Sequence, residues 1–300
     1  MRALITGGKG FVGQWLAAHL AERGDEVAAI DVETDVADGG AVRRVMDDVA
    51  PDAVYHLAAL THVGESWDDP SRVLRVNVLG TAEILAAARA VGSAPRVLVV
   101  SSAEVYGVVR PEQLPITENS PARPVSPYAA SKLAAEAIAL QAWRGFGQPV
   151  IVVRPFNHIG PGQSPSFFVP AMAKRIVEAK SSGAASLPVG TLTTRRDFTD
   201  VRDVVVAYRL LIERGLPGEV YNVCSGRDVA MSEVAAQLLE LADADVKLET
   251  DPSLVRPVDV PVLRGDASRL RAATGWQPTI ALATSLTDVL ASWEAKAVEG

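Results

Sequence analysis

The sequence contains a single cysteine, Cys224, few aromatic residues and no long uninterrupted apolar run. A lone cysteine can form neither an internal disulfide nor a thiolate metal site. His56 and His62 lie off the common ligand spacings, so we expect packing roles for both and no bound metal. Because no apolar stretch reaches the ~18 residues of a transmembrane helix, we expect no membrane partner. The first residues show no signal-peptide pattern, which favours a cytoplasmic location.

Basic residues are fewer than acidic residues. Lysine and arginine total 29 against 36 aspartates and glutamates, which gives a formal net charge of −7. A large nucleic-acid-binding face needs a surplus of positive charge, so no nucleic-acid partner is expected. Local arginines can still hold one small anion. Hydrophobic residues make up 48% of the chain, which excludes intrinsic disorder as the main state.

The first half of the chain alternates between short apolar runs and amphipathic stretches. Strands are expected at 3–6, 26–31, 53–58, 96–102 and 149–155, and helices at 11–24, 41–50, 77–91 and 127–143. Ser126 and Pro127 provide an N-cap and a first helical residue for the last of these helices. This βαβα order predicts a doubly wound parallel sheet with helices on both faces.

The pattern becomes less regular after Pro155. The segment 157–166 is rich in Gly, Pro and Ser and is typical of a loop. We expect a helix at 169–180, a short linker and a helix within 196–215, and a strand at 219–225. Two further helices are expected at 232–242 and 281–297, around a proline-rich loop at 252–261.

A glycine-rich turn follows the first expected strand. In TGGKGFVG (6–13), Gly7 permits a tight turn, Gly10 lets the backbone approach a pyrophosphate, and Gly13 allows close packing of helix on strand. The N-terminus of the next helix faces the anion. Asp31 ends the second strand, where a carboxylate accepts hydrogen bonds from an adenosine ribose and repels a 2′-phosphate. We therefore expect NAD(H) or NADP(H) as cofactor, and Asp31 favours NAD(H).

Tyr128 and Lys132 lie four residues apart on one helix and therefore share a face. An ammonium group one turn from a phenol favours the phenolate and lowers the tyrosine pKa, which suits proton transfer at neutral pH. Ser102 ends a strand at the carboxyl edge of the sheet, where its hydroxyl can bond a substrate carbonyl oxygen. Together with the glycine turn, these residues indicate an oxidoreductase active site.

Motifs that span nearly the whole chain give it a family resemblance. They are TGGKGFVG (6–13), HLAA (56–59), VNVLGT (76–81), VSSAEVYG (100–107), SPYAASK (126–132), RPFN (154–157), RDFTDVRD (196–203) and RP (256–257). In this order they resemble the extended short-chain dehydrogenases/reductases that act on nucleotide sugars. RPFNHIGPGQ (154–163), RRDFTDVRD (195–203) and YNVCSG (221–226) are most similar to the GDP-4-keto-6-deoxy-mannose reductases of that family.

The resemblance implies reduction of the C4 ketone of GDP-4-keto-6-deoxy-D-mannose to GDP-D-rhamnose. Tyr128 would protonate the oxyanion, Lys132 would bind the nicotinamide ribose, and Ser102 would orient the ketone. Cofactor contacts are implied for Gly7, Gly10, Phe11, Val12, Asp31, Asp35, Val36, Leu57, Ala58, Ala59, Tyr128, Lys132 and Pro155. Contacts with the GDP-linked substrate are implied for Thr61, Ser102, Ala103, Glu104, Asn157, Val169, Lys174, Arg196 and Arg256.

Alternatives remain open within and outside this reaction. Related 4,6-dehydratases often carry Asp and Glu where this chain has Ala103 and Glu104, and Ala103 cannot protonate a leaving hydroxyl; some dehydratases lack that Asp as well. A 4-epimerase uses the same Ser, Tyr and Lys. A non-catalytic dinucleotide-binding regulator is disfavoured because such proteins tend to lose the tyrosine or lysine.

The domain organisation follows from these assignments. We predict an α/β protein in which residues 1–155 plus about 191–226 form a Rossmann domain that binds NAD(P). Residues from about 156–190 plus 227–300 would form a smaller α/β lobe for the substrate. Family members often form dimers through two helices per subunit. Here the candidates are 77–91 and 127–143, whose faces contain Ala86, Ala87, Ala88, Ala134, Ala135 and Ala137.

Overall fold

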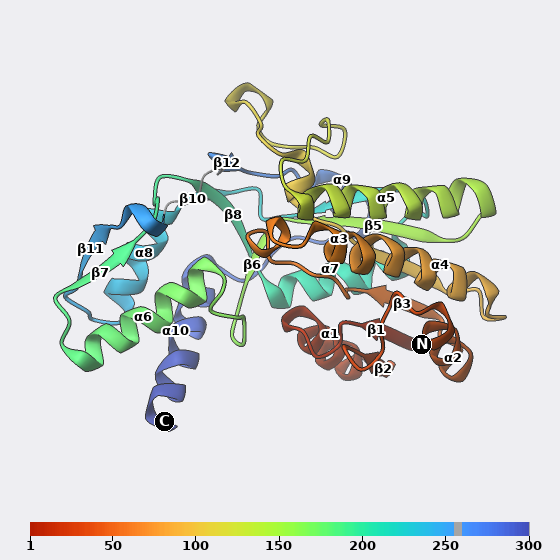
Figure 1. Ribbon diagram of the computed structural model, residues 1–300, viewed down its shortest axis with the longest axis horizontal. Helices are drawn as coiled ribbons and strands as arrows, with labels where there is room; N and C mark the ends of the chain where they lie inside the picture. Colours follow the sequence, from red (N-terminus) through yellow and green to blue (C-terminus); the bar gives the residue numbers. More distant parts are fainter. Residues whose placement is uncertain (255–259, 300) are drawn as a thin grey trace.

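A six-stranded parallel sheet forms the centre of the protein in the computed structural model, which describes residues 1–254 and 260–299. The strands are β1 (Arg2–Thr6), β2 (Glu26–Ile30), β3 (Ala53–His56), β4 (Arg96–Val100), β5 (Val150–Pro155) and β9 (Val220–Val223). Their order is β2-β1-β3-β4-β5-β9, and each neighbouring pair is parallel. The predicted doubly wound parallel sheet is confirmed (Figure 1).

Each strand contributes to two cores, because successive side chains point to opposite faces of the sheet. Ile5 and Leu98 pack on one face, and Leu4 and Val97 pack on the other. The first face is covered by α1 (Phe11–Glu22), α7 (Val201–Arg214) and α9 (Ser268–Thr274). The second is covered by α2 (Gly39–Val49), α4 (Gly80–Ala90) and α5 (Pro127–Phe146).

The helix expected at 77–91 begins earlier than predicted. Helical structure starts with α3 (Pro70–Leu74), continues through a π-helical turn at Arg75–Leu79 and then enters α4. The Asp69 carboxylate accepts a hydrogen bond from the Arg72 N–H, and Pro70 fills the first helical position. Both are helix-start signals. The sequence analysis missed them because the apolar periodicity becomes clear only at Val76.

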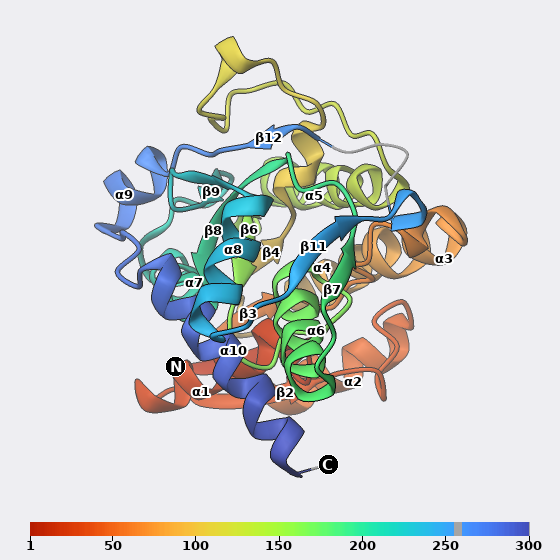
Figure 2. The ribbon, with the colours of Figure 1, turned by 90° about the vertical axis from the view of Figure 1, so that its left-hand side faces the viewer.

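The second half of the chain builds a lobe from small sheets. In it β8 (Arg195–Asp200) pairs with β6 (Asn157–Ile159), β10 (Asp228–Ala230) and β12 (Val262–Leu263), while β7 (Ser186–Val189) pairs with β11 (Lys247–Thr250). The helices α6 (Phe168–Ser182), α8 (Met231–Leu241) and α10 (Leu282–Glu299) enclose its core. Figure 2 shows this lobe from its own side, with α6 and α10 packed together.

Two segments differ from the predicted pattern. The expected loop at 157–166 begins with the strand β6, and the expected linker at 196–200 is the strand β8. The sequence of β8 is polar and does not alternate, because its buried charged groups are satisfied by partners; Asp197, for example, accepts hydrogen bonds from Ser225 and from the Gly226 and Gly265 N–H groups. A hydrophobic pattern therefore does not identify this strand.

The division of the chain into two domains stays a prediction, and strand pairing bears on its boundaries. Strand β8 pairs within the lobe, whereas α7 and β9, which follow it, belong with the large sheet. The helix α9 also packs on α7, although its residues were assigned to the lobe. None of the helices within the described ranges is long and apolar enough to cross a membrane.

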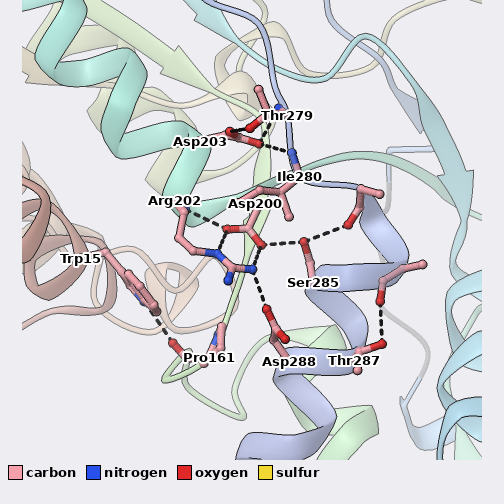
Figure 3. A network of polar contacts seen from close by, with 12 residues as sticks. Trp15, Pro161, Asp200, Arg202, Asp203, Thr279, Ile280, Ser285, Thr287 and Asp288 are labelled. Carbon is pink, nitrogen blue, oxygen red and sulfur yellow. Dashed lines mark hydrogen bonds and ion pairs between the residues drawn. The ribbon is translucent and has the colours of Figure 1, made fainter.

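A polar network connects the start of α7 to α10 (Figure 3). The Arg202 guanidinium donates to both carboxylate oxygens of Asp200, at 2.8 Å each, and to Asp288 at 2.7 Å. The Ser285 hydroxyl donates to Asp200 at 2.6 Å. In addition, the Asp203 carboxylate accepts hydrogen bonds from the residues that precede α10. This network therefore fixes α10 of the lobe against the large-sheet half.

Candidate active site

A cleft of about 990 Å³ runs along the carboxyl edge of the large sheet. One wall comes from residues at or just after the ends of strands, including Gly7, Ala58 and Ser102. The opposite wall comes from the lobe, including Met172 and Thr194. In open parallel sheets, ligands bind outside the carboxyl ends of the strands, so this cleft is the candidate active site.

The glycine turn forms one end of the cleft and leaves no space for larger residues. Gly7 has a φ of 75°, and a Cβ there would lie 2.9 Å from the Ala58 nitrogen. A Cβ on Gly13 would lie 2.2 Å from the Gly7 oxygen. Gly10 precedes α1 and provides no side-chain cap for its first N–H groups. Such groups attract a phosphate, so the turn has the shape and polarity of a pyrophosphate cradle.

The same wall contains further features that fit a dinucleotide. Asp31 lines the cleft at the end of β2, with Oδ2 accepting from the Lys9 N–H at 2.7 Å. Tyr208 of α7 also lines the cleft, and its buried hydroxyl has no hydrogen-bond partner among the described residues. Besides Gly7, Gly10 and Asp31, the predicted cofactor contacts that line the cleft are Phe11, Val12, Asp35, Val36, Leu57, Ala58, Ala59, Tyr128, Lys132 and Pro155.

Ser102, Tyr128 and Lys132 all line the cleft, and the side chains of Ser102 and Tyr128 form a hydrogen bond. Ser102 precedes a short 3₁₀ turn, and its hydroxyl accepts the Glu104 N–H at 3.2 Å. Burial raises the pKa of Tyr128 to about 12, although a hydrogen bond with the Ser102 side chain opposes this rise. Burial lowers the pKa of Lys132 to about 8, although the charge of Glu136 opposes this decrease.

The tyrosine therefore differs in one respect from the sequence expectation. Lys132 was expected to lower the pKa of Tyr128, but burial dominates and the pKa rises. The Lys132 ammonium group donates to the Val100 carbonyl oxygen at 2.8 Å, which directs it to the end of β4. Tyr128 is thus a neutral phenol at neutral pH, the protonation state that a proton donor requires.

The start of α5 and its neighbours hold Tyr128 in place. The Ser126 hydroxyl accepts the Ala129 N–H at 3.1 Å, which confirms the predicted N-cap. Asn77, in the π-helical turn, donates to the Ser131 hydroxyl at 2.9 Å and to the Leu60 carbonyl at 3.1 Å. π-Helical turns often occur at functional sites. Asn77 thus joins the loop after β3 to the tyrosine helix, a role that the sequence analysis did not assign.

A buried ion pair lies behind the three polar residues. Arg154, in β5, donates to Glu136 through Nε at 2.9 Å and through Nη2 at 2.6 Å. Arg154 also donates to the Tyr106 hydroxyl at 3.0 Å, and the Ser101 hydroxyl donates to Glu136. This pair connects β4, α5 and β5, the elements that carry Ser102, Lys132 and Pro155. The sequence analysis did not assign this pair. The signal that could have indicated Glu136 was its position one helical turn after Lys132.

The predicted substrate contacts fall into two groups. Those that line the cleft are Thr61, Ser102, Ala103, Glu104, Asn157 and Arg196. Arg196 is buried and its Nη1 donates to the Val260 carbonyl at 2.7 Å. Arg256 lies outside the described residues.

The structure does not place Val169 and Lys174 in the cleft. Phe168, Ala171, Met172 and Arg175 line it instead, at the i, i+3, i+4 and i+7 spacing of one helix face. Val169 is buried in the core of the lobe. The Lys174 ammonium lies 3.6 Å from Glu178 and 5.9 Å from the centre of the Trp293 ring. The adjacent cation, Arg175, is the one at the cleft, and no motif in the sequence indicated it.

His56 has the packing role expected of it, whereas His62 lines the cleft beside Glu65, at 3.5 Å. His56 is buried between the Thr6 and Thr81 hydroxyls, at 2.8 and 3.0 Å. Burial and the charge of Lys132 lower its pKa to about 3, so it is neutral. Within residues 1–254 and 260–299, no group of three or more His, Cys, Asp or Glu residues is arranged to hold a metal ion.

Known proteins are similar to this chain over most of its length. The sequence model of the family described as GDP-mannose 4,6 dehydratase matches residues 30–289. GDP-6-deoxy-D-mannose reductase from Pseudomonas aeruginosa is 40% identical over 99% of both chains. GDP-6-deoxy-D-talose 4-dehydrogenase from Aggregatibacter actinomycetemcomitans is 32% identical over 92% of both chains.

Solved structures of related proteins have the same fold over nearly the whole chain. The structure of RMD from Pseudomonas aeruginosa complexed with NADPH has a TM-score of 0.91 at 40% identity and covers 98% of this chain and 99% of its own. A UDP-glucose 4-epimerase from Thermus thermophilus in complex with NAD has a TM-score of 0.88 at 29% identity, with 98% and 99% covered. The chain therefore belongs to the GDP-mannose 4,6-dehydratase family of extended short-chain dehydrogenases/reductases that act on nucleotide sugars.

Proposed function

We propose that this protein reduces the C4 ketone of GDP-4-keto-6-deoxy-D-mannose to give GDP-D-rhamnose, with NAD(P)H as reductant. The main observation behind this proposal is Tyr128. Its side chain is a neutral phenol that forms a hydrogen bond with the Ser102 side chain, and it lines a cleft that fits a dinucleotide. Full-length similarity to a GDP-6-deoxy-D-mannose reductase supports the choice of substrate.

Bound NAD(P)H would supply a hydride for C4. Gly7, Gly10 and the start of α1 would hold its pyrophosphate through backbone N–H groups, and Asp31 would accept hydrogen bonds from its adenosine ribose. Ser102 donates a hydrogen bond to the C4 oxygen and orients the ketone. Tyr128 donates its phenolic proton to that oxygen as negative charge develops, so a C–H and an O–H bond replace the carbonyl double bond.

The positive charge of Lys132 assists the proton transfer from Tyr128. With a pKa of about 8, it is mostly protonated at neutral pH. Its ammonium group stabilises the phenolate that Tyr128 leaves after proton transfer. It also binds the nicotinamide ribose. Glu136 supports the positive charge from one helical turn away.

The nucleotide sugar would contact both walls of the cleft. Thr61, Ala103 and Glu104 would contact the sugar, and Asn157 would contact the sugar or the diphosphate. Arg196 and Arg175 provide guanidinium groups for the diphosphate, because a planar fork suits two phosphate oxygens. Arg175 takes the place that the sequence analysis gave to Lys174, since it lines the cleft. The contact assigned to Arg256 remains a prediction.

Ala103 argues against a dehydratase that uses an aspartic acid at this position. It is buried at the wall of the cleft, and its methyl group cannot protonate a leaving hydroxyl. A 4-epimerase would use the same Ser102, Tyr128 and Lys132, so assays must separate the two activities. An epimerase retains its cofactor, whereas a reductase consumes one reduced cofactor in each turnover.

The test supplies GDP-4-keto-6-deoxy-D-mannose with NADH or NADPH and follows cofactor oxidation, with the product identified by NMR. We expect stoichiometric oxidation and GDP-D-rhamnose. Conversion of GDP-mannose alone to a 4-keto sugar, without net cofactor use, would contradict the reductase assignment. Tyr128→Phe should lower turnover by about 10²–10⁴-fold.

We also propose that the protein is a cytoplasmic homodimer. Leu74 and Leu79 are exposed beside α4, and Ala137 is exposed on α5, so these helices offer an apolar face to a second copy. Ala87, Ala88 and Ala135 are buried within the chain and do not contribute to that face. Light scattering on the protein as it elutes from a size-exclusion column would give its mass directly. A monomer mass at micromolar concentration would reject the dimer.

A further inference from the structure

Trp67 is a large aromatic residue that the fold leaves exposed inside the cleft. It is 57% exposed. All five tryptophans lie in the described ranges, and Trp67 is the one that lines the cleft. The Trp15 and Trp276 N–H groups donate to the carbonyl oxygens of Pro161 and Asp203, so these two rings stabilise the fold. An exposed aromatic ring in a cleft is, by contrast, a typical ligand contact.

A short turn connects Trp67 to the backbone of Tyr128. The buried Ser66 hydroxyl accepts the Tyr128 N–H at 3.2 Å and donates to the Val63 carbonyl oxygen at 2.6 Å. Trp67 follows Ser66 directly, at the end of the 3₁₀ turn Glu65–Trp67. The indole therefore belongs to a turn that is held against the start of the tyrosine helix.

Two more exposed apolar side chains line the cleft in neighbouring segments. Val125 directly precedes Ser126, the N-cap of α5. Phe167, which precedes α6 in the lobe, contacts His62 edge-to-face, with the ring centres 6.5 Å apart. His62 lies in the same loop as Trp67. Apolar groups from both walls thus border the cleft around the loop after β3 and the start of α5.

The following inference rests on the proposed function and deepens it. The C4 carbon of the sugar must lie beside Tyr128, because Tyr128 protonates its oxygen. C6 is attached to C5, the neighbour of C4, so the methyl group of a 6-deoxy sugar lies two bonds from the reacting carbon. We propose that Trp67, together with Val125, contacts this C6 methyl group and thereby selects 6-deoxy sugars over their 6-hydroxy counterparts.

The physical basis of this selection is the difference between a methyl and a hydroxymethyl group. A methyl group that packs on the indole leaves water, which is favourable. A 6-hydroxyl in the same place loses hydrogen bonds to water. The Ser66 hydroxyl does not replace them, because it is buried and already donates to Val63 and accepts from Tyr128. Apolar sites reject an added hydroxyl by up to roughly 100-fold.

The test compares two GDP-sugars that differ only at C6. GDP-D-rhamnose has a methyl group there, and GDP-D-mannose has a hydroxymethyl group. Titration calorimetry gives the Kd of each for the full chain. We expect GDP-D-rhamnose to bind about 10–100-fold more tightly to the wild-type protein. Trp67→Ala should reduce this preference to less than about threefold, whereas Trp67→Phe should keep most of it, because an aromatic ring remains.

Catalysis provides a second readout. In the reduction of GDP-4-keto-6-deoxy-D-mannose, Trp67→Ala should raise KM by about 10-fold and change kcat by less than about threefold, because the methyl contact is the same in the ground state and the transition state. A purely structural role would instead lower kcat and the Tm. Because Trp67 is exposed, its replacement should leave the Tm unchanged.

Two controls separate contact with the hexose from general effects. The Kd of GDP, which has no hexose, should be the same for the wild-type protein and Trp67→Ala. The matched variant is Trp143→Ala, which removes an indole that packs beside Gly218 and does not line the cleft. It should leave the Kd values of both GDP-sugars unchanged.

The outcomes distinguish this inference from the proposed function. If the wild-type protein binds both GDP-sugars equally, or if Trp67→Ala keeps the full preference, the inference is wrong, and reduction of the 4-keto sugar by the wild-type protein would still support the reductase assignment. An equal loss of preference in Trp143→Ala would also overturn the inference. If the wild-type protein neither binds GDP-D-rhamnose nor reduces the 4-keto sugar, the proposed function fails together with it.

Discussion

The large sheet and the lobe form opposite walls of one cleft, and they are built differently. Strands β1 to β5 follow one another through βα units, so each motif at a strand end is local in sequence. In the lobe, β8 pairs with β6 before it and with β10 and β12 after it. The wall from the large sheet is therefore encoded in short motifs, whereas the wall from the lobe depends on long-range pairing.

The two regions also use arginine–carboxylate pairs differently. The Glu136–Arg154 pair lies inside the large-sheet half, with side chains 2% and 9% exposed. The Arg202–Asp288 pair joins the large-sheet half to the lobe, with side chains 32% and 34% exposed. A buried pair that loses one partner leaves an uncompensated charge, whereas an exposed pair is replaced by water. This contrast suggests the following experiments.

Glu136→Gln should have the largest effect on stability. It leaves the Arg154 charge buried without its partner, and we expect a loss of about 3–5 kcal/mol in the free energy of unfolding. Urea unfolding followed by tryptophan fluorescence measures it. Adding Arg154→Met should restore part of the loss, because both charges are then absent. A loss below about 1 kcal/mol would remove the contrast between the two regions.

Arg175→Ala tests the wall formed by the lobe. It removes a guanidinium group from the cleft, and we expect the KM for the GDP-sugar to rise by about 10–50-fold with the Kd of NADH unchanged. Lys174→Ala is the matched control, because that neighbouring cation lies away from the cleft and should change KM less than about twofold. Equal effects of the two variants would show that the face of α6 does not determine substrate binding.

The pH profile tests the wall of the large sheet. Lys132 loses its charge as the pH rises through about 8, whereas Tyr128, with a pKa of about 12, keeps its proton. We expect kcat/KM to fall above pH 8, to roughly one-tenth at pH 9. The folded pKa of Lys132 lies below the ordinary 10.5, so its burial costs most stability below pH 8, and this cost is relieved between pH 8 and 10.5. A profile flat to pH 10 would show that the charge of Lys132 is not required.

Asp288→Asn should have the smallest effect. Arg202 keeps its two hydrogen bonds to Asp200, and we expect a loss of at most about 1 kcal/mol by the same urea measurement. Arg43→Gln on α2 is the matched surface control, because it removes one partner of the exposed Arg43–Asp47 pair. If Asp288→Asn destabilises the protein as much as Glu136→Gln, the Arg202–Asp288 pair contributes as much to the free energy of unfolding as the buried Glu136–Arg154 pair.

The predictions from the sequence were more successful for the large sheet than for the lobe. The large sheet, the glycine turn and the meeting of Ser102, Tyr128 and Lys132 were predicted, because each depends on periodicity or spacing within one βα unit. Strand β8 was predicted as a linker, because its polar residues are satisfied by partners distant in sequence. Lys174 was chosen over Arg175 because a motif does not show which face of a helix meets the cleft.

The sequence by itself determined the fold class, the place of the dinucleotide turn and the residue types available for proton transfer. Only the tertiary structure decided the protonation state of Tyr128, because burial raises the pKa of its phenol. It also decided that Lys9 and Arg75, which come from separate elements, pair with Glu33 and Asp35 of the segment after β2. Local spacing fixes periodicity, but burial and pairing between distant segments are properties of the folded chain.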